Sequence, residues 1–137
     1  WAAELHEIGL FMGYSGHHKH GSYVLAHADL AGFSRQEQRA LAAMVLGHRG
    51  RFSAARLEQL RPRLYVPYRL ILLLRVAVRL HRRRSPKPLP SFRAQVKDKA
   101  LILTFPEGWL EKRPLTVADL ELEQNRCREV KLQLVFG

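Results

Sequence analysis

Histidine is the residue type in this chain with the clearest potential for chemistry. Five of the seven histidines fall between His6 and His27, and His48 closes the run. His6 is followed directly by Glu7, inside an apolar helical setting. Imidazole and carboxylate groups that converge on one or two divalent cations activate water for attack on a phosphoester. In such a site His6, Glu7, His20 and His48 would meet at one point from three helices.

The pattern also resembles the metal site of HD phosphohydrolases, which place a histidine-carboxylate pair on a buried helix. The chain departs from that pattern, because its pair reads His-Glu and because Val78 stands where the family has a ligand aspartate. A cation ringed by imidazoles and arginines with one glutamate would be poorly neutralised. We therefore expect a degenerate HD site that holds no metal at His6, Glu7, His20 and His48. A standalone HD-type metal phosphohydrolase is the alternative.

A row of arginines is the second candidate site. The net charge of +11 implies a polyanionic partner, whether nucleic acid, polyphosphate or an acidic lipid surface. No Asp or Glu occurs between Glu58 and Asp98, so the carboxylates that usually accompany a solvated basic face are absent from this stretch. A spaced row of guanidinium groups suits a chain of phosphates. The helical spacing therefore predicts a polyanion-binding face made of Arg75, Arg79, Arg82 and Arg83.

The loop Ser15–His20 is the third candidate. It combines small residues with hydrogen-bond donors and leads into a predicted helix N-terminus, where backbone N–H groups favour anions. Exposed histidines in such a loop titrate near neutrality, so phosphate binding would tighten as the pH falls. A flexible surface loop is the equal alternative. The residues predicted to bind polyphosphate from this region are His17, His18, Lys19, His20 and Arg49.

Hydrophobic periodicity divides the chain into a helical part and a smaller mixed part. Residues 1–84 are predicted to form a helical domain, and the prolines of residues 85–90 form a linker that cannot continue a helix. Residues 91–137 are predicted to form a small α+β domain, because apolar and polar residues alternate there as in strands. The predicted fold class is therefore mainly α, an HD-domain-like helical bundle followed by a small α+β domain.

The expected elements follow from the same periodicity. The helices are Trp1–Met12, His20–Asp29, one capped by a Ser34–Glu37 capping box, Ser53–Leu60 and Tyr68–Arg83. After the linker, a hairpin with its tip at Asp98-Lys99 joins a half-buried strand through Phe92, Ala94 and Val96 to a strand at Leu101–Phe105. The remaining elements are a helical turn at Pro106–Leu110, a strand at Thr116–Leu120, a helix at Glu121–Glu129 and a strand at Lys131–Phe136.

Several other classes lack support in the sequence. Aromatic residues do not alternate with basic ones, and no helix-turn-helix or zinc-finger spacing appears, so no specific nucleic acid partner is expected. Leu70–Leu80 is broken by Arg75 and Arg79 and is too short to span a membrane. Cys127, the one cysteine, is interpreted as a passive helical residue. Trp1 opens a helix without a preceding cap, which predicts a fragment of a longer protein.

Three segments carry a resemblance to a known enzyme family. They are WAAELHEIGLFMGYSGHHKHGSYVL, AGFSRQEQRALAAMVLGHRG and LLRVAVRLHRRR. They resemble the C-terminal part of exopolyphosphatases and of their relatives, the guanosine pentaphosphate phosphohydrolases. The resemblance extends through residues 1–84, and the FPEGW and DLELEQ segments continue it more loosely through residues 91–137.

The resemblance implies a parent enzyme with two N-terminal actin-like domains, absent from this chain, that hold the active site and bind Mg²⁺. It implies that this region is not catalytic, lengthens a polyphosphate-binding channel and helps to form a homodimer. The expected parent is a cytoplasmic exopolyphosphatase that removes terminal phosphate processively from inorganic polyphosphate, with a peripheral position at the inner membrane as an alternative. A guanosine pentaphosphate phosphohydrolase and a purely structural dimerisation module also remain open.

Overall fold

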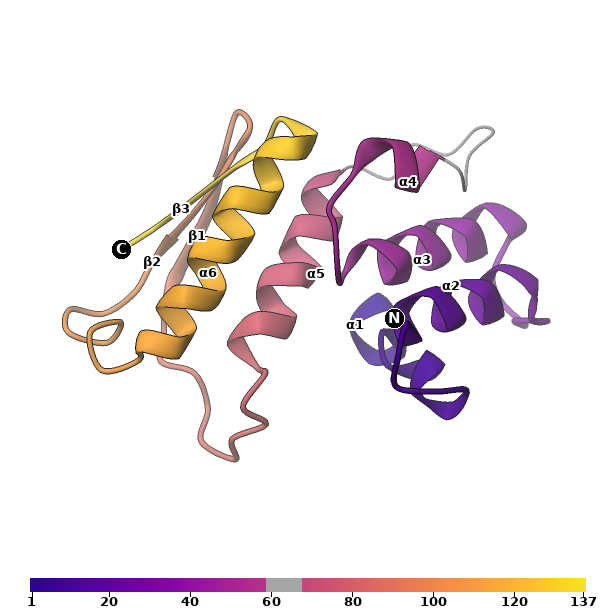
Figure 1. The fold of residues 1–137 in the computed structure, drawn as a ribbon, viewed down its shortest axis with the longest axis horizontal. Helices are drawn as coiled ribbons and strands as arrows, with labels where there is room; N and C mark the ends of the chain where they lie inside the picture. The colour runs from indigo at the N-terminus through magenta and orange to yellow at the C-terminus, as the bar shows by residue number, and fades with distance from the viewer. Residues whose placement is uncertain (59–67) are drawn as a thin grey trace. The chain divides into compact units, whose positions relative to one another are not determined.

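Helix α5, Tyr68–Leu80, is shared between the two units of this fold. The computed structural model describes residues 1–58 and 68–137. Unit 1 is Trp1–Leu74 and unit 2 is Arg75–Gly137, so the boundary lies within α5, ahead of the proline-rich segment 85–90 (Figure 1). The reason is a change of partners along α5. Ile71 lies against Gly47 of unit 1, whereas the Arg75 side chain pairs with Glu123 of unit 2.

Unit 1 consists of short helices. They are α1 (Ala2–Leu5), the 3-10 helix η1 (Ile8–Phe11), α2 (His17–His27), α3 (Arg35–Gly47), α4 (Ala54–Glu58) and the first half of α5. The pair α2 and α3 forms the centre of the unit (Figure 1). Its fully buried apolar side chains include Leu25 of α2, Val45 of α3, Ile71 of α5 and Phe52.

The first helix differs from the prediction. Instead of one helix over Trp1–Met12, the chain forms α1 and η1 with His6 and Glu7 between them. The cause is close packing of η1 on α2 at Gly9. A Cβ atom at Gly9 would overlap the carbonyl oxygen of His17 and lie 2.5 Å from the backbone nitrogen of Gly21.

Some of the other helix boundaries predicted for unit 1 agree with the structure and others are shifted. The capping box is confirmed, since the Glu37 backbone N–H donates to Ser34 Oγ and the Ser34 N–H donates to Glu37 Oε2. Helix α2 begins at His17, three residues earlier than predicted, because Gly16 adopts a φ of 69° and ends the preceding turn there. Helix α4 lies within the predicted Ser53–Leu60, whose last two residues are outside the described ranges.

Unit 2 is built on a three-stranded sheet. Strands β1 (Arg93–Lys97) and β2 (Ala100–Thr104) form the predicted antiparallel hairpin, which turns at Asp98-Lys99. Strand β3 (Gln133–Phe136) pairs with β2 in parallel, and helix α6 (Pro114–Cys127) with the 3-10 helix η2 (Arg128–Val130) connects them. Figure 1 shows α6 lying along the sheet. Leu101, Leu103, Leu120 and Leu134 form the core between them.

Two predictions for unit 2 were wrong. Thr116–Leu120 is not a strand but part of α6, because Leu120, Glu123 and Cys127 share one buried helical face. Pro106–Leu110 contains a tight turn rather than a helical turn, because Gly108 has a φ of 70° while the Trp109 N–H donates to the Pro106 carbonyl oxygen at 3.1 Å.

The predicted burial of the first strand was also wrong. All five residues of β1 are exposed, and Val96 is 51% exposed, because β1 is the edge strand and the core lies under β2 and β3. Phe92 instead stacks on Phe105, with ring centroids 5.0 Å apart.

Cys127 is the last residue of α6 and is buried, so its predicted position in a helix is confirmed. Among the described helices none is long and apolar enough to cross a membrane.

Candidate functional site

Unit 1 gathers four histidine rings where the start of α2 meets the end of α3. The ring centroid of His48 lies 5.2 Å from that of His6, 5.5 Å from that of His17 and 6.3 Å from that of His18. His17 and His18 are in the first turn of α2, and His48 follows the last turn of α3. These last three rings are buried, whereas His20 is half-buried. His17 and His18, rather than the predicted His20, therefore complete the group.

The His6–Glu7 pair does not sit on a buried helix, which corrects the sequence interpretation. It occupies the break between α1 and η1, where His6 Nδ1 donates to the Ala3 carbonyl oxygen at 2.6 Å. The Glu7 carboxylate is 4.0 Å from His6 Nε2, and the Glu7 side chain is 43% exposed. Across residues 1–58 and 68–137, no three His, Cys, Asp or Glu side chains are arranged to hold a metal ion.

Burial controls the protonation of the histidine group. It lowers the pKa of His18 to about 4, and the positive charges of Arg56 and Arg49 act in the same direction. Burial also lowers the pKa of His48 to about 4, opposed by the hydrogen bond from His48 Nδ1 to the Val45 carbonyl. The expectation of titration near neutrality is therefore wrong for His18, because the predicted loop is the first turn of a packed helix.

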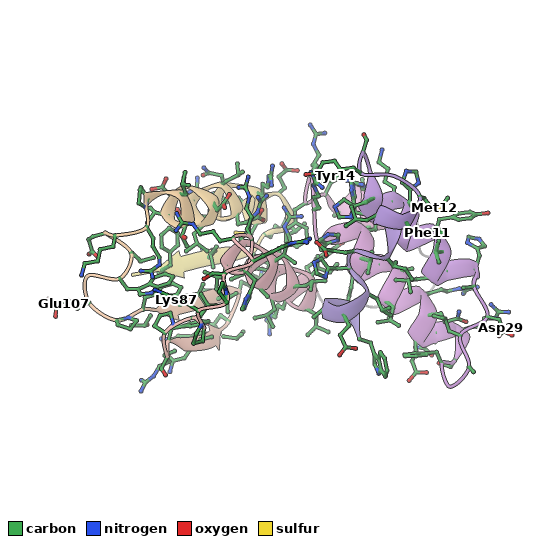
Figure 2. The ribbon with its side chains drawn as sticks, turned by 90° about the horizontal axis from the view of Figure 1, so that it is seen from below. Phe11, Met12, Tyr14, Asp29, Lys87 and Glu107 are labelled. Atoms are coloured by element: carbon green, nitrogen blue, oxygen red, sulfur yellow. The ribbon has the colours of Figure 1, made fainter. Side chains whose placement is uncertain are left out.

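Two basic residues near this group are accessible to solvent. Lys19 and Arg49 are exposed, and the Arg49 guanidinium lies over the ring of Tyr14, 5.5 Å from its centroid. Tyr14, labelled in Figure 2, is itself 76% exposed. These cations and the half-buried His20 are the predicted phosphate ligands of unit 1 that a polyanion can reach in this structure. Their role in binding stays a prediction.

The arginine row begins on α5 and continues past its end, and three of its members pair with carboxylates of α6. Arg75 is fully buried, and its Nε donates to Glu123 Oε2 at 2.6 Å while its Nη2 donates to Glu123 Oε1 at 3.1 Å. Arg79 Nε also donates to Glu123 Oε1 at 3.1 Å. Arg82 Nη1 donates to both oxygens of Asp119, at 2.8 and 3.0 Å. Three of the four predicted phosphate ligands therefore already have protein counter-ions.

These ion pairs change the interpretation of the basic row. Burial lowers the pKa of Arg75, and the hydrogen bond to Glu123 opposes that effect, so the side chain functions here as a buried ionic contact. A polyanion cannot reach Arg75 in this conformation. Arg83 is exposed, and Arg82 keeps 66% of its side-chain surface exposed, so a binding role for these two stays a prediction. Sequence reasoning missed Glu123 because it lies 48 residues beyond Arg75.

Comparison with known proteins shows which family this chain belongs to. The family model "Ppx/GppA phosphatase, domain III" matches residues 1–124, which include both the histidine group and the arginine row. The chain belongs to the Ppx/GppA phosphatase family. The resemblance inferred from the three sequence segments is thereby confirmed.

Curated members of the Ppx/GppA family match nearly the whole chain. A guanosine-5'-triphosphate,3'-diphosphate pyrophosphatase of Pseudoalteromonas translucida (strain TAC 125) is 35% identical over 135 residues, 98% of this chain and 27% of the relative. A protein of the same name in Pseudoalteromonas atlantica is 38% identical over 124 residues, which are 90% of this chain and 25% of the relative. The one in Vibrio cholerae is 37% identical over 129 residues, 94% and 26%. The chain thus spans about a quarter of the length of these relatives.

Proposed function

We propose that this chain is the domain III region of a phosphohydrolase that cleaves a phosphoanhydride bond, and that its own role is to bind the phosphates of the substrate. The observation that carries this proposal is a net charge of +11 in a member of a phosphatase family. A phosphorylated substrate is a polyanion, and a basic surface raises its local concentration and accelerates its association. The catalytic groups and Mg²⁺ then belong to N-terminal actin-like domains outside this chain.

Two substrates fit this role. The names of relatives at 33–38% identity favour guanosine-5'-triphosphate,3'-diphosphate. Inorganic polyphosphate is the second candidate, and the large positive charge favours it because a long chain engages many cations at once. The proposed contacts are the exposed or partly exposed basic side chains Lys19, His20 and Arg49 in unit 1, and Arg82 and Arg83 in unit 2. Homodimer formation and an HD-like origin of unit 1 belong to the same proposal.

The decisive experiment is binding of the 137-residue chain to long-chain polyphosphate over a series of salt concentrations. Each phosphate contact releases condensed counter-ions, so the logarithm of the affinity should fall linearly with the logarithm of salt. Single-stranded DNA of equal total charge serves as the competitor, and guanosine-5'-triphosphate,3'-diphosphate is tested beside GTP. Tighter binding of polyphosphate than of DNA, increasing with chain length, supports the polyphosphate branch. Selective binding of the guanosine pentaphosphate over GTP supports the other branch.

A matched pair of variants tests the proposed contacts. Lys19→Gln with Arg49→Gln removes two exposed cations beside the histidine group and should reduce the salt slope by about 1–2. Arg35→Gln with Arg39→Gln removes two exposed cations of α3 at the same cost in net charge and should change the slope less. Equal slopes for the two double variants would show that only total charge matters and would reject these contacts. No binding of either phosphate ligand by the parent chain would reject the proposed role.

A further inference from the structure

The arginine row of unit 2 contains two kinds of ion pair. Arg75 and Glu123 form a fork, because Nε donates to one carboxylate oxygen at 2.6 Å and Nη2 donates to the other at 3.1 Å. Both side chains are at most 1% exposed, so no ligand reaches this pair. In the second kind, Arg82 donates to both oxygens of Asp119 from Nη1, and the Arg82 side chain is 66% exposed. The Arg75–Glu123 pair is therefore closed to solvent, whereas the Arg82–Asp119 pair is open to it.

The geometry of the Arg82–Asp119 pair allows the carboxylate to be exchanged for another anion. A guanidinium binds carboxylate and phosphate groups best through two nitrogens at once, whereas both hydrogen bonds from Arg82 to Asp119 start at Nη1. A solvent-exposed ion pair contributes little to stability, because water and salt screen the attraction. A phosphate group that engages two nitrogens of Arg82 can therefore displace Asp119.

Asp119 keeps a counter-ion when Arg82 leaves. Arg79 Nη1 donates to Asp119 Oδ1 at 3.4 Å, and Arg79 Nε donates to Glu123 Oε1 at 3.1 Å. The Asp119 side chain is only 13% exposed, so its charge would be costly to leave unpaired. Because Arg79 stays beside it, the contact with Arg82 can open without creating a buried, unpaired carboxylate.

The residues that follow Arg82 favour an incoming polyanion. Arg83, Arg84 and Lys87 are exposed, and no Asp or Glu occurs in the sequence between Glu58 and Asp98. A ligand with several phosphates attracts these cations together with Arg82, whereas Asp119 offers a single negative charge. The exchange therefore favours a chain of phosphates over a single small anion.

We infer that Asp119 is an internal competitor for the substrate phosphates, and that its contact with Arg82 keeps this end of the arginine row closed until a polyanion displaces it. The inference rests on the proposed function, because it takes Arg82 as a phosphate contact. Weakly charged anions leave the contact intact, and a chain of phosphates opens it. Arg75 stays paired with Glu123 in both states.

The test compares two variants that each remove one negative charge from α6. Asp119→Asn removes the carboxylate that faces Arg82, and Glu121→Gln removes an exposed carboxylate two residues along the same helix. The affinity of each variant for long-chain polyphosphate is measured over a series of salt concentrations. We expect Asp119→Asn to bind about 2–5-fold more tightly than Glu121→Gln, the effect of losing a weak, exposed ion pair. Addition of Arg82→Gln to Asp119→Asn should abolish this gain.

A second measurement follows Asp119 in the unmutated chain and decides the inference even when a variant fails to fold. With isotope-labelled carboxyl groups, the NMR signal of the Asp119 carboxyl carbon should shift as polyphosphate saturates the chain. The signal of the Glu123 carboxyl carbon should stay in place, because its pair with Arg75 is closed to solvent.

The outcomes separate this inference from the proposed function. Equal affinities of Asp119→Asn and Glu121→Gln, or polyphosphate binding without a shift at Asp119, overturn the inference and leave the proposed function standing. Failure of the unmutated chain and of both variants to bind polyphosphate or the guanosine pentaphosphate rejects both. Binding by Asp119→Asn alone supports the competitor role and rejects the proposed role of the unmutated chain.

Discussion

Replacement of Arg75 should destabilise unit 2 and leave polyphosphate binding intact. Its side chain is fully buried and donates two hydrogen bonds to Glu123, which is itself fully buried. A channel-lining arginine would behave in the opposite way, because its loss would flatten the salt dependence of binding and leave the fold intact. The variant Arg75→Gln therefore separates an internal ion pair from a ligand contact.

The expected magnitude follows from the contacts that remain. Removal of one partner of a buried ion pair costs about 3–5 kcal/mol, because the other charge stays buried without compensation. Glu123 keeps donors at 3.1 Å from both Arg79 and Arg126, so part of its charge remains neutralised. We therefore expect the lower end, a loss of about 3 kcal/mol in the free energy of unfolding.

Urea unfolding followed by tryptophan fluorescence measures this loss. The chain has two tryptophans, and in a Trp1→Phe background Trp109 alone reports on unit 2. With a slope of about 1–1.5 kcal/mol per molar urea, a loss of about 3 kcal/mol lowers the midpoint by about 2–3 M. Arg93→Gln on the exposed edge strand is the matched control. It should change the free energy of unfolding by less than about 0.5 kcal/mol.

Two results would refute the reasoning. One is a loss below about 1 kcal/mol, the range of an exposed ion pair. The other is a flatter salt dependence of polyphosphate binding in a variant that folds normally, which would place Arg75 at the ligand. A double-mutant cycle with Glu123→Gln adds a second check, since residues in direct contact should give a double loss smaller than the sum of the single losses.

Three further predictions concern unit 1. Ser34→Ala removes the cap of α3 and should cost about 1 kcal/mol, measured by urea unfolding monitored by circular dichroism; an unchanged midpoint would contradict the capping contact. Gly9→Ala should lower the free energy of unfolding by about 3 kcal/mol or more, because the added Cβ would overlap the His17 carbonyl. Gly13→Ala is the control and should be tolerated, because a Cβ there meets nothing within 4 Å. Similar melting temperatures for the two variants would contradict the packing of η1 on α2. Acidification should weaken unit 1, because the folded-state pKa of His18 and of His48, about 4, lies below the unfolded value of about 6.5, so the unfolded chain binds more protons between these values. The free energy of unfolding should fall by up to about 1.4 kcal/mol per pH unit for each histidine as the pH drops below about 6.5, and it should level off below about 4. Chemical unfolding at a series of pH values measures this profile. An equally steep profile in a His48→Gln variant would show that His48 does not contribute.

Features encoded by neighbouring residues could be predicted from the sequence. The capping box needs only Ser34 and Glu37, three positions apart, and it forms as expected. The hairpin at Asp98-Lys99 needs only two alternating segments and a residue that tolerates positive φ, and Asp98 indeed has a φ of 51°. Family membership was also readable, because it depends on the order of residues rather than on their contacts.

Features set by packing were predicted poorly. Periodicity suggested a helix through Trp1–Met12, but the approach of Gly9 to α2 breaks it into two short pieces. The β-branched and apolar residues of Thr116–Leu120 suggested a strand, but the segment is helical because one of its faces continues into Glu123 and Cys127. In both cases a contact distant in sequence outweighed the local pattern.

The sequence by itself determined that this protein carries a large positive surplus and a dense group of histidines, since both follow from composition and order. Only the tertiary structure decided which of those charges can meet a ligand. Arg75 is neutralised by Glu123, 48 residues away, whereas Lys19 and Arg49 are exposed to solvent. The physical reason is that the ability of a charged side chain to bind a ligand depends on its burial and its counter-ions, and both are properties of the folded chain.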